Sequence, residues 1–409
     1  RQLSGCSFTG LDPKNLMSPP KANADQQSIH KLLQGGRPDI TFIYPKSGEY
    51  RSAIIMQDFT GDGVKDAIGF YTPDDSKSVE VQFLVKDGGE WKTAAVFPNA
   101  ATQVDRVCFG DLTGDGKQDV LIGWGSSIGT TGRTASVSAY LYSDGDVKEV
   151  SLGTYGEMAV TDFDGDGVSE VFTIDKFVAP EKEDAQPSPA QAKVYEFRNG
   201  ELREAAAVEA DNSISHYAAI SFGRLTATLQ GVVVDGATAD GSMTTQVFFL
   251  ENRRLVNTPA GVNGENYTNP FSRPSAATFT SRDIDGDGYL ELPVVTPLPG
   301  IPDTVTPDAT SYLVEWCTFE RDGNTHTVMK TLMNPPEHYW FRLPYELWGK
   351  LSASNDAAKR TVTYTETVPS GEDGEQLLGS PLFSIRVFTQ SAWESRGQTS
   401  GYTQLASQS

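Results

Sequence analysis

Four carboxylates lie within nine positions of one another in the stretch TDFDGDGVSEVFTI, residues 161–174. They are Asp162, Asp164, Asp166 and Glu170, and two glycines alternate with them before an apolar run begins. Carboxylates placed this close together repel one another unless they share a cation. The alternative is that Asp and Gly simply form tight turns, held by short bonds between side chain and backbone.

The same acidic motif recurs along the chain, and this repetition favours a shared cation. Its copies begin at Asp58 (DFTGDGVKDAIGF), Asp111 (DLTGDGKQDVLIG), Asp162 (DFDGDGVSEVFTI) and Asp283 (DIDGDGYLELPVV). A further copy, RLTATLQGVVVDG from Arg224, has lost its acids. Successive copies begin about 50 to 60 residues apart, which is the spacing of a repeated structural unit. Turns that arose by chance would not keep this period.

Each acidic motif leads into strand-like residues. Numbered from the first Asp, the acids occupy positions 1, 3, 5 and 9, and glycine occupies position 6. Alternate side chains and the backbone carbonyl at position 7 can converge on one point. Ligands that are all oxygen suit a hard cation, and Ca²⁺ takes about 6 to 8 of them. An EF-hand needs Glu at position 12 and flanking helices. Position 12 here is Gly69, Ile122, Thr173 or Val294, so the EF-hand is excluded.

A tight turn follows each acidic motif at a similar distance. The turns lie at residues 87, 144, 199 and 322, with Asn252 in the matching place of the unit that lost its acids. Asp-Gly or Asn-Gly between apolar runs is a strong hairpin signal. Alternating apolar residues such as Val79, Val81 and Phe83 precede the first turn. Each unit therefore predicts four antiparallel strands, the pattern of a propeller blade.

These motifs resemble the FG-GAP/VCBS-type repeats of integrin-α-like β-propellers, in four strong units and one decayed unit over residues 50–335. The resemblance implies structural Ca²⁺ in the loop between the first two strands of a blade. It also implies that the ligands are the side chains at positions 1, 3, 5 and 9 and the carbonyl at position 7. On this sequence the first two sites are Asp58, Thr60, Asp62, Val64, Asp66, and Asp111, Thr113, Asp115, Lys117, Asp119. The other two are Asp162, Asp164, Asp166, Val168, Glu170, and Asp283, Asp285, Asp287, Tyr289, Glu291.

The sites differ in the number of their acids, so we expect between two and four calcium ions. Thr60 and Thr113 replace Asp at position 3, which leaves three carboxylates in each of the first two sites. Those sites should bind more weakly, or hold Na⁺ or water instead. The loop at Arg224 should bind no metal. Turns without any ion remain the alternative at every site.

The predicted fold is all-β: a β-propeller of six, or seven, four-stranded antiparallel blades with calcium-binding loops, over residues 38–409. Five units are in phase, and a weaker sixth covers residues 339–351, 360–368 and 381–390. Residues 40–44 could supply a strand that closes the ring against the last blade. Residues 1–37 should form a polar tether with a short helix at residues 28–34.

Charge and cysteines limit the possible partners. The formal net charge of −21 argues against nucleic acid and against anionic membrane surfaces. Leu3-Ser4-Gly5-Cys6 resembles a bacterial lipobox, in which a signal peptide is cut before a Cys that is then lipidated. We therefore expect an extracellular, secreted protein whose only membrane contact is a lipid anchor at Cys6. Cys108 and Cys317 lie in apolar runs and are expected to be buried small residues rather than catalytic thiols.

The expected function is non-enzymatic recognition of a protein or glycan at the cell surface by a monomer. The connectors between the second and third strands of a unit vary most, at residues 125–136, 178–193 and 296–311, and would carry the partner. Free drift of surface insertions is the alternative. The chain contains no HExxH or phosphate-binding loop, and no catalytic residue is predicted. A polysaccharide hydrolase or lyase remains the rival function, because paired acids leave no local pattern. A purely structural accessory module is the third option.

Overall fold

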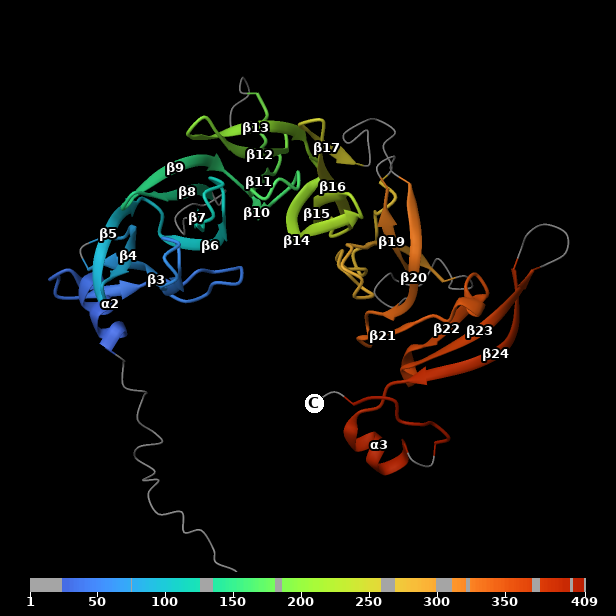
Figure 1. Ribbon diagram of the computed structural model, residues 1–409. Coiled ribbons are helices and arrows are strands. Elements are labelled where there is room, and N and C mark those ends of the chain that lie inside the picture. Colours follow the sequence, from blue (N-terminus) through green and yellow to red (C-terminus); the bar gives the residue numbers. More distant parts are fainter. Residues whose placement is uncertain are drawn as a thin grey trace, which may run out of the picture. The chain divides into compact units, whose positions relative to one another are not determined.

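A computed structural model describes residues 24–74, 76–125, 135–180, 186–258, 269–298, 311–320, 324–369, 376–397 and 400–407. Within these ranges the chain forms six antiparallel sheets (Figure 1). The prediction of an all-β fold is therefore confirmed. The chain divides into two compact units, residues 1–154 and 155–409.

The first unit contains two sheets that share one apolar core. The first sheet consists of β1 (Ile40–Phe42), β2 (Ile54–Gln57), β3 (Asp66–Pro73), β4 (Val79–Asp87) and β5 (Glu90–Asn99). The second consists of β6 (Gln103–Gly110), β7 (Asp119–Gly125), β8 (Ser136–Ser143) and β9 (Asp146–Thr154). The rings of Phe83 and Tyr140 meet across this core, with centroids 5.3 Å apart. Residues of both sheets belong to this one core, so each sheet covers an apolar face of the other.

Helix α2 (Ala24–Gln34) includes residues 28–34, where a short helix was predicted, but it packs on the first sheet instead of belonging to a polar tether. Ile29 and Leu33 are buried against the strands. A Cβ atom at Gly69 would lie 2.5 Å from Leu33 Cδ2, so only glycine lets the helix approach this closely. Lys86 Nζ lies 2.8 Å from Asp25 Oδ2 and ties the start of the helix to β4.

The predicted role of residues 40–44 is wrong. Instead of joining the last sheet, β1 pairs with β3, where Phe42 lies opposite Tyr71. It continues the edge of β3 beyond the end of β2, which pairs with the other half of the same strand. Apolar contacts explain this placement, because Ile40 and Phe42 pack with Leu33 of the helix. The first sheet thus has five strands.

The second unit contains four sheets. The third sheet consists of β10 (Glu157–Thr161), β11 (Glu170–Asp175), β12 (Gln191–Arg198) and β13 (Glu201–Glu209). The fourth consists of β14 (Ile214–Thr226), β15 (Leu229–Thr238), β16 (Met243–Glu251) and β17 (Arg254–Thr258). The fifth consists of β18 (Leu292–Pro297), β19 (Tyr312–Phe319), β20 (Thr325–Asn334) and β21 (Tyr339–Arg342). The sixth consists of β22 (Leu351–Asp356), β23 (Thr361–Pro369) and β24 (Gln376–Arg386), followed by helix α3 (Gln390–Arg396).

Aromatic side chains connect each sheet of this unit to the next. Phe172 and Phe248 link the third and fourth sheets, with ring centroids 5.2 Å apart. Phe249 contacts Phe319 of the fifth sheet, and Phe341 contacts Tyr364 of the sixth. The fourth and fifth sheets therefore each contact a neighbouring sheet on two sides.

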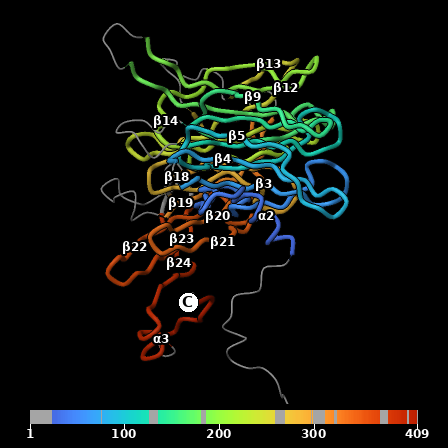
Figure 2. Tube along the Cα trace, turned by 90° about the vertical axis from the view of Figure 1, so that its left-hand side faces the viewer, coloured from blue at the N-terminus to red at the C-terminus, as the bar shows by residue number. Residues whose placement is uncertain are grey.

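The last predicted unit is assigned differently in the structure. Tyr339–Arg342 pairs with β20 and belongs to the fifth sheet, although the sequence suggested the sixth. The sixth sheet consequently has three strands, β22, β23 and β24, which run side by side (Figure 2). The prediction of four strands in this sheet is wrong, because Trp340 and Phe341 extend the hairpin of β20 instead of starting a new sheet.

The tight turns follow the prediction wherever they are described. Asp144 and Asn199 have φ of 52°, the left-handed region that these turns require. The unit that lost its acids has a short turn at residues 227–228 between β14 and β15, in place of an acidic loop. Among the described residues, no helix has the length and hydropathy needed to cross a membrane.

Candidate metal centres

The two ends of each acidic loop are joined by one pair of residues, which lie opposite each other on neighbouring backbone segments. The residue just before the loop pairs with the acid at position 9 in all four copies. These pairs are Gln57 with Asp66, Gly110 with Asp119, Thr161 with Glu170, and Arg282 with Glu291. The first three loops therefore lie between a first and a second strand, as predicted, whereas the fourth is closed by an isolated bridge and no described strand precedes it in residues 269–281.

The Asp at position 1 organises the loop backbone. Asp162 accepts hydrogen bonds from Gly165 N at 2.7 Å and from Gly167 N at 3.0 Å. Both glycines have positive φ, 80° and 90°, which other residues rarely adopt. Asp58, Asp111 and Asp283 accept the corresponding two bonds in their own loops. The turn chemistry is thus the same in all four copies.

The Asp at position 5 fixes the residue at position 7. Asp166 Oδ1 accepts a hydrogen bond from Val168 N at 2.8 Å. The same bond joins Val64 to Asp62, Lys117 to Asp115, and Tyr289 to Asp287. The residues at position 7, expected to offer a carbonyl, are therefore held by their own amides.

The acid at position 9 forms a buried base beneath an exposed rim. Asp66, Asp119, Glu170 and Glu291 are all at most 4% exposed, whereas the acids at position 5 are exposed. Glu170 Oε2 accepts a hydrogen bond from Phe163 N at 2.7 Å, and Glu291 Oε2 accepts one from Ile284 N at 2.9 Å. Two ends of the loop are thus joined through a carboxylate.

Burial without a positive partner shifts the protonation of these acids. Burial, together with repulsion from neighbouring carboxylates, raises the pKa of Glu170 to about 8 and that of Glu291 to about 7. Burial likewise raises the pKa of Asp119 to about 6, and it raises the pKa of Asp66. A bound cation would remove the cost of keeping these groups charged.

Two loops bring their acids into one cluster. In the third loop, ligand atoms of Asp162, Asp164 and Glu170 lie within 4.8 Å of one another. Asp283, Asp285 and Glu291 do the same in the fourth. These two clusters could bind a metal ion. Within the described ranges, the carboxylates of the first two loops form no such group.

Among the described residues, two buried loop oxygens have no hydrogen-bond partner within the chain, so each has a lone pair available for a cation. Glu291 Oε1 is one, and Thr113 Oγ1 at position 3 of the second loop is the other. A buried oxygen without a partner costs about 1 to 3 kcal/mol unless something coordinates it. In the same second loop, Lys117 Nζ lies 3.6 Å from Asp115 Oδ2, so a side-chain cation competes there. The donor sets of the third and fourth loops fit a hard cation, because only these two bring three carboxylates together among the described residues.

Several predicted sites fall outside the described residues. Cys6 does so, as do most of the connectors at residues 125–136 and 296–311 and the middle of 178–193. Of the other cysteines, Cys317 is buried and burial raises the pKa of its thiol, whereas Cys108 is half-buried. The predicted burial is therefore confirmed for Cys317 but not for Cys108.

One motif escaped the sequence reasoning. Gly125, Ser126, Ser127, Ile128 and Gly129 match the G-x-S-x-G pattern of hydrolase nucleophiles. That pattern requires a strand followed by a helix. Here β7 is followed by β8, its antiparallel neighbour, and Ser127 itself lies outside the described residues. The context therefore does not support a catalytic serine.

A small pocket of about 160 Å³ lies away from the acidic loops, between the fifth and sixth sheets. Glu337, Tyr339 and Arg360 are among the residues that line it. The Arg360 guanidinium Nε bonds both oxygens of Glu337, at 2.9 and 3.0 Å. This carboxylate is already paired, so it is a poor candidate for a free general base.

Comparisons with known proteins leave the family open. No protein-family model and no curated protein matches the chain. Similar solved structures include exotype rhamnogalacturonan lyase YesX, with 15% identity and a TM-score of 0.34 over 81% of this chain and 70% of that chain. Rhamnogalacturonan lyase YesW has 12% identity and a TM-score of 0.34 over 85% and 72%. Rhamnogalacturonan lyase PL11 of Bacillus licheniformis has 13% identity and a TM-score of 0.34 over 85% and 71%. Similarity at this level assigns neither a family nor an activity to this chain.

Proposed function

We propose that the four acidic loops bind Ca²⁺, and that the sheets are blades of a β-propeller similar to the FG-GAP/VCBS type. The observation that carries the proposal is the repeated loop geometry. Position 1 binds two glycine amides, position 5 binds the amide of position 7, and position 9 is a buried acid. Turns that needed no ion would not require a buried acid at their base.

In this proposal the ion is structural. It would link Asp164 on the exposed rim with Glu170 at the start of β11, and thereby fix the end of the strand pair. The oxygen ligands offered are mostly exposed carboxylates and a backbone carbonyl, which suit the flexible coordination of Ca²⁺. The third and fourth loops should fill first, because they bring three carboxylates together.

We further propose that the domain recognises a protein or glycan outside the cell, anchored through a lipid on Cys6. The connectors at residues 125–136, 178–193 and 296–311 would supply the binding surface, because they are longer than the matching connector of the first unit, residues 72–78, while the acidic loops stay constant. The net charge of −21 argues against nucleic acid and anionic lipid as partners of this domain, because they would repel it.

The metal sites are tested by thermal unfolding in calcium and in EDTA. An ion that binds only the folded state stabilises it by about 2.7 kcal/mol at a hundredfold excess over Kd. The calcium-dependent rise in Tm should shrink in Asp164→Ala and in Asp285→Ala. Asp240→Ala is the matched control, because Asp240 only accepts turn bonds from Thr238 Oγ1 and Ser242 N. It should lower Tm equally in both buffers. If the loop variants behave like this control, the acids only shape turns.

The recognition role is tested by screening cell-surface proteins and glycans, rhamnogalacturonan among them, for retention and for cleavage. A recognition module should retain a ligand without releasing reducing ends, and shortening residues 125–136 or 296–311 should abolish retention. Retention by both shortened, folded variants would disprove the role of these connectors. Release of reducing ends, stopped by replacing an acid outside the four loops, would instead establish a hydrolase or lyase.

A further inference from the structure

The fourth acidic loop differs from the others in the contacts that fix the backbone just before its first residue, Asp283. In the first three loops, the pair that closes the loop continues into β2–β3, β6–β7 or β10–β11. In the fourth, Arg282 and Glu291 form an isolated bridge, with backbone bonds of 3.1 and 2.9 Å. No described strand precedes this bridge in residues 269–281. Some other contact must hold the backbone that leads into the loop.

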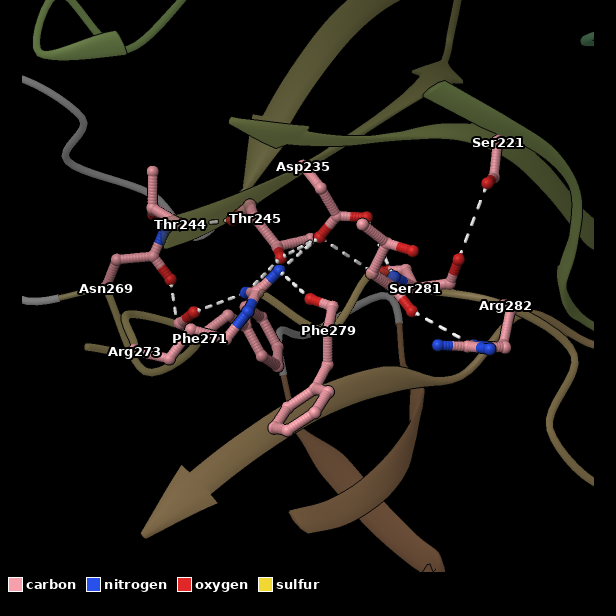
Figure 3. A network of polar contacts seen from close by, with 11 residues as sticks. Ser221, Asp235, Thr244, Thr245, Asn269, Phe271, Arg273, Phe279, Ser281 and Arg282 are labelled. Atoms are coloured by element: carbon pink, nitrogen blue, oxygen red, sulfur yellow. Dashed lines mark hydrogen bonds and ion pairs between the residues drawn. The ribbon is translucent and has the colours of Figure 1, made fainter. Parts of the chain in front are cut away.

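A buried ion pair takes that place. Asp235 of β15 and Arg273 lie 2.8 Å apart, with side chains 1% and 0% exposed (Figure 3). Asp235 Oδ2 accepts a 2.8 Å bond from Ser281 N, and Oδ1 accepts a 3.2 Å bond from Ser281 Oγ. The carboxylate thus holds the residue just before Arg282, where the loop begins.

The Arg273 guanidinium donates hydrogen bonds to backbone carbonyls of the irregular segment that contains it, residues 269–281. Arg273 donates to Phe271 O at 2.9 Å and to Phe279 O at 2.5 Å, and its backbone pairs with Met243 in both directions. Thr245 Oγ1 bonds both members of the pair (Figure 3). A buried charge that loses its partner costs several kcal/mol, so these contacts form or break together.

The far end of the loop is tied to the same sheet. Leu290 N donates a 2.8 Å hydrogen bond to Arg224 O, near the end of β14. Ser281 O also lies 3.5 Å from Ser221 Oγ of β14. Both ends of the fourth loop are therefore attached to the fourth sheet. Without these ties the repulsion among Asp283, Asp285 and Glu291 would favour a wider loop.

We propose that Asp235 and Arg273 are positioning residues for the fourth cation site. The fourth sheet has lost its own acidic loop and instead holds the loop of the next unit in its binding geometry. This inference rests on the proposed function, because it assumes that the loop takes a divalent cation. It adds that the affinity of this one loop depends on an ion pair that contacts no metal.

Terbium luminescence tests the inference at a single site. Only the fourth loop has tyrosine at position 7, where Tyr289 can sensitise bound Tb³⁺. The emission that Tyr289→Phe removes is therefore assigned to this loop. In Asp235→Asn one amide hydrogen must face either Ser281 N–H or the guanidinium, so at least one bond is lost. We expect this variant to need about tenfold more Tb³⁺, or more, for half of that emission.

Two further variants keep the test decisive. Gln246→Leu is the control, because Gln246 is buried on β16 and bonds Asp211 and Asn257 but not the loop. It should destabilise the protein and leave the emission curve in place. If Asp235→Asn does not fold, Ser281→Ala removes only the 3.2 Å bond, and a shift of about threefold is expected. Unchanged titration of the folded variant would overturn the positioning role and leave the calcium sites standing. No Tyr289-dependent emission and no effect of calcium on Tm in the wild type would overturn both proposals.

Discussion

Asp162 and Glu170 bring carboxylate oxygens to within 4.8 Å of each other across the third acidic loop. Asp162 is held by two glycine amides and Glu170 by the amide of Phe163, and none of these donors is a cation. Hydrogen bonds from backbone amides orient the two carboxylates, but they leave most of the negative charge uncompensated. The stability of this loop must therefore depend on what else binds there, either a proton or a metal ion.

The first prediction concerns pH in the absence of metal. Burial raises the pKa of Glu170 from 4.5 to about 8, so the folded protein holds this proton more tightly than the unfolded chain does. A group whose pKa is higher in the folded protein stabilises the fold by its full amount at pH values below its pKa in the unfolded chain. This stabilisation is lost as the pH rises through its pKa in the folded protein. In EDTA, Tm should therefore fall between about pH 4.5 and pH 8. In saturating calcium the fall should be smaller, because the ion replaces the proton.

Glu170→Gln is the control for this titration. The amide cannot ionise, so the slope of Tm against pH in EDTA should flatten, while the benefit from calcium should shrink. Equal slopes for wild type in EDTA and in calcium would show that no ion competes with the proton. The acid would then be an ordinary buried group.

The second prediction ranks the sites. Thr113 leaves the second loop one carboxylate short, and its buried Oγ1 has no hydrogen-bond partner. Calcium affinity rises with the number of charged ligands. Thr113→Asp should therefore tighten binding in the second loop by about tenfold or more, and Asp164→Thr should weaken the third loop by a similar factor. Calorimetric titration with calcium measures both. No gain of affinity in Thr113→Asp would mean that Lys117, whose Nζ lies 3.6 Å from Asp115 Oδ2, offsets the added carboxylate.

Local patterns explain what could be predicted from the sequence. The acidic loops and hairpins depend on residues only a few positions apart, such as Asp162 with Gly165 or Asn199 with Gly200. Asp and Gly at fixed offsets specify such turns wherever they occur. The strand pairs around the first three acidic loops were therefore predicted correctly, together with the all-β class.

Contacts between distant segments could not be predicted in the same way. A three-residue strand such as β1 suits several sheet edges, and the contacts of Ile40 and Phe42 with Leu33 of the helix decide where it pairs. Asp235 and Arg273 are far apart in the sequence and meet between a strand and an irregular segment. A charged residue after the apolar run Val232–Val234 was the available signal, because such a position is usually buried. The sequence did not show which positive partner it would find.

The third prediction tests how helix α2 is attached. A methyl group at Gly69 would lie 2.5 Å from Leu33 Cδ2, so Gly69→Ala should displace the helix and cost about 1 to 3 kcal/mol. Hydrogen exchange of the α2 amides should accelerate at the same time. Leu33→Ala makes room for the methyl group, so the double variant should be more stable than the sum of the two single effects predicts. Additive effects would mean that the helix and β3 do not share this contact.

The last prediction concerns the turn between β16 and β17. Arg253 has φ of 65°, in a position where Gly200 occupies the equivalent turn of the third sheet. A left-handed conformation costs a residue with a side chain about 1 to 2 kcal/mol, and glycine removes this strain. Part of the stabilisation is lost again, because glycine increases the conformational entropy of the unfolded chain. Its ion pair with Glu196 is 3.5 Å long, and the Arg253 side chain is 64% exposed, so losing it should matter little. Arg253→Gly should therefore raise the unfolding free energy by about 0.5 to 1 kcal/mol, measured by denaturation in saturating calcium.

The converse variant, Gly200→Arg, should lower the unfolding free energy by a similar amount. A drop in stability for Arg253→Gly would show that the contact with Glu196 outweighs the strain.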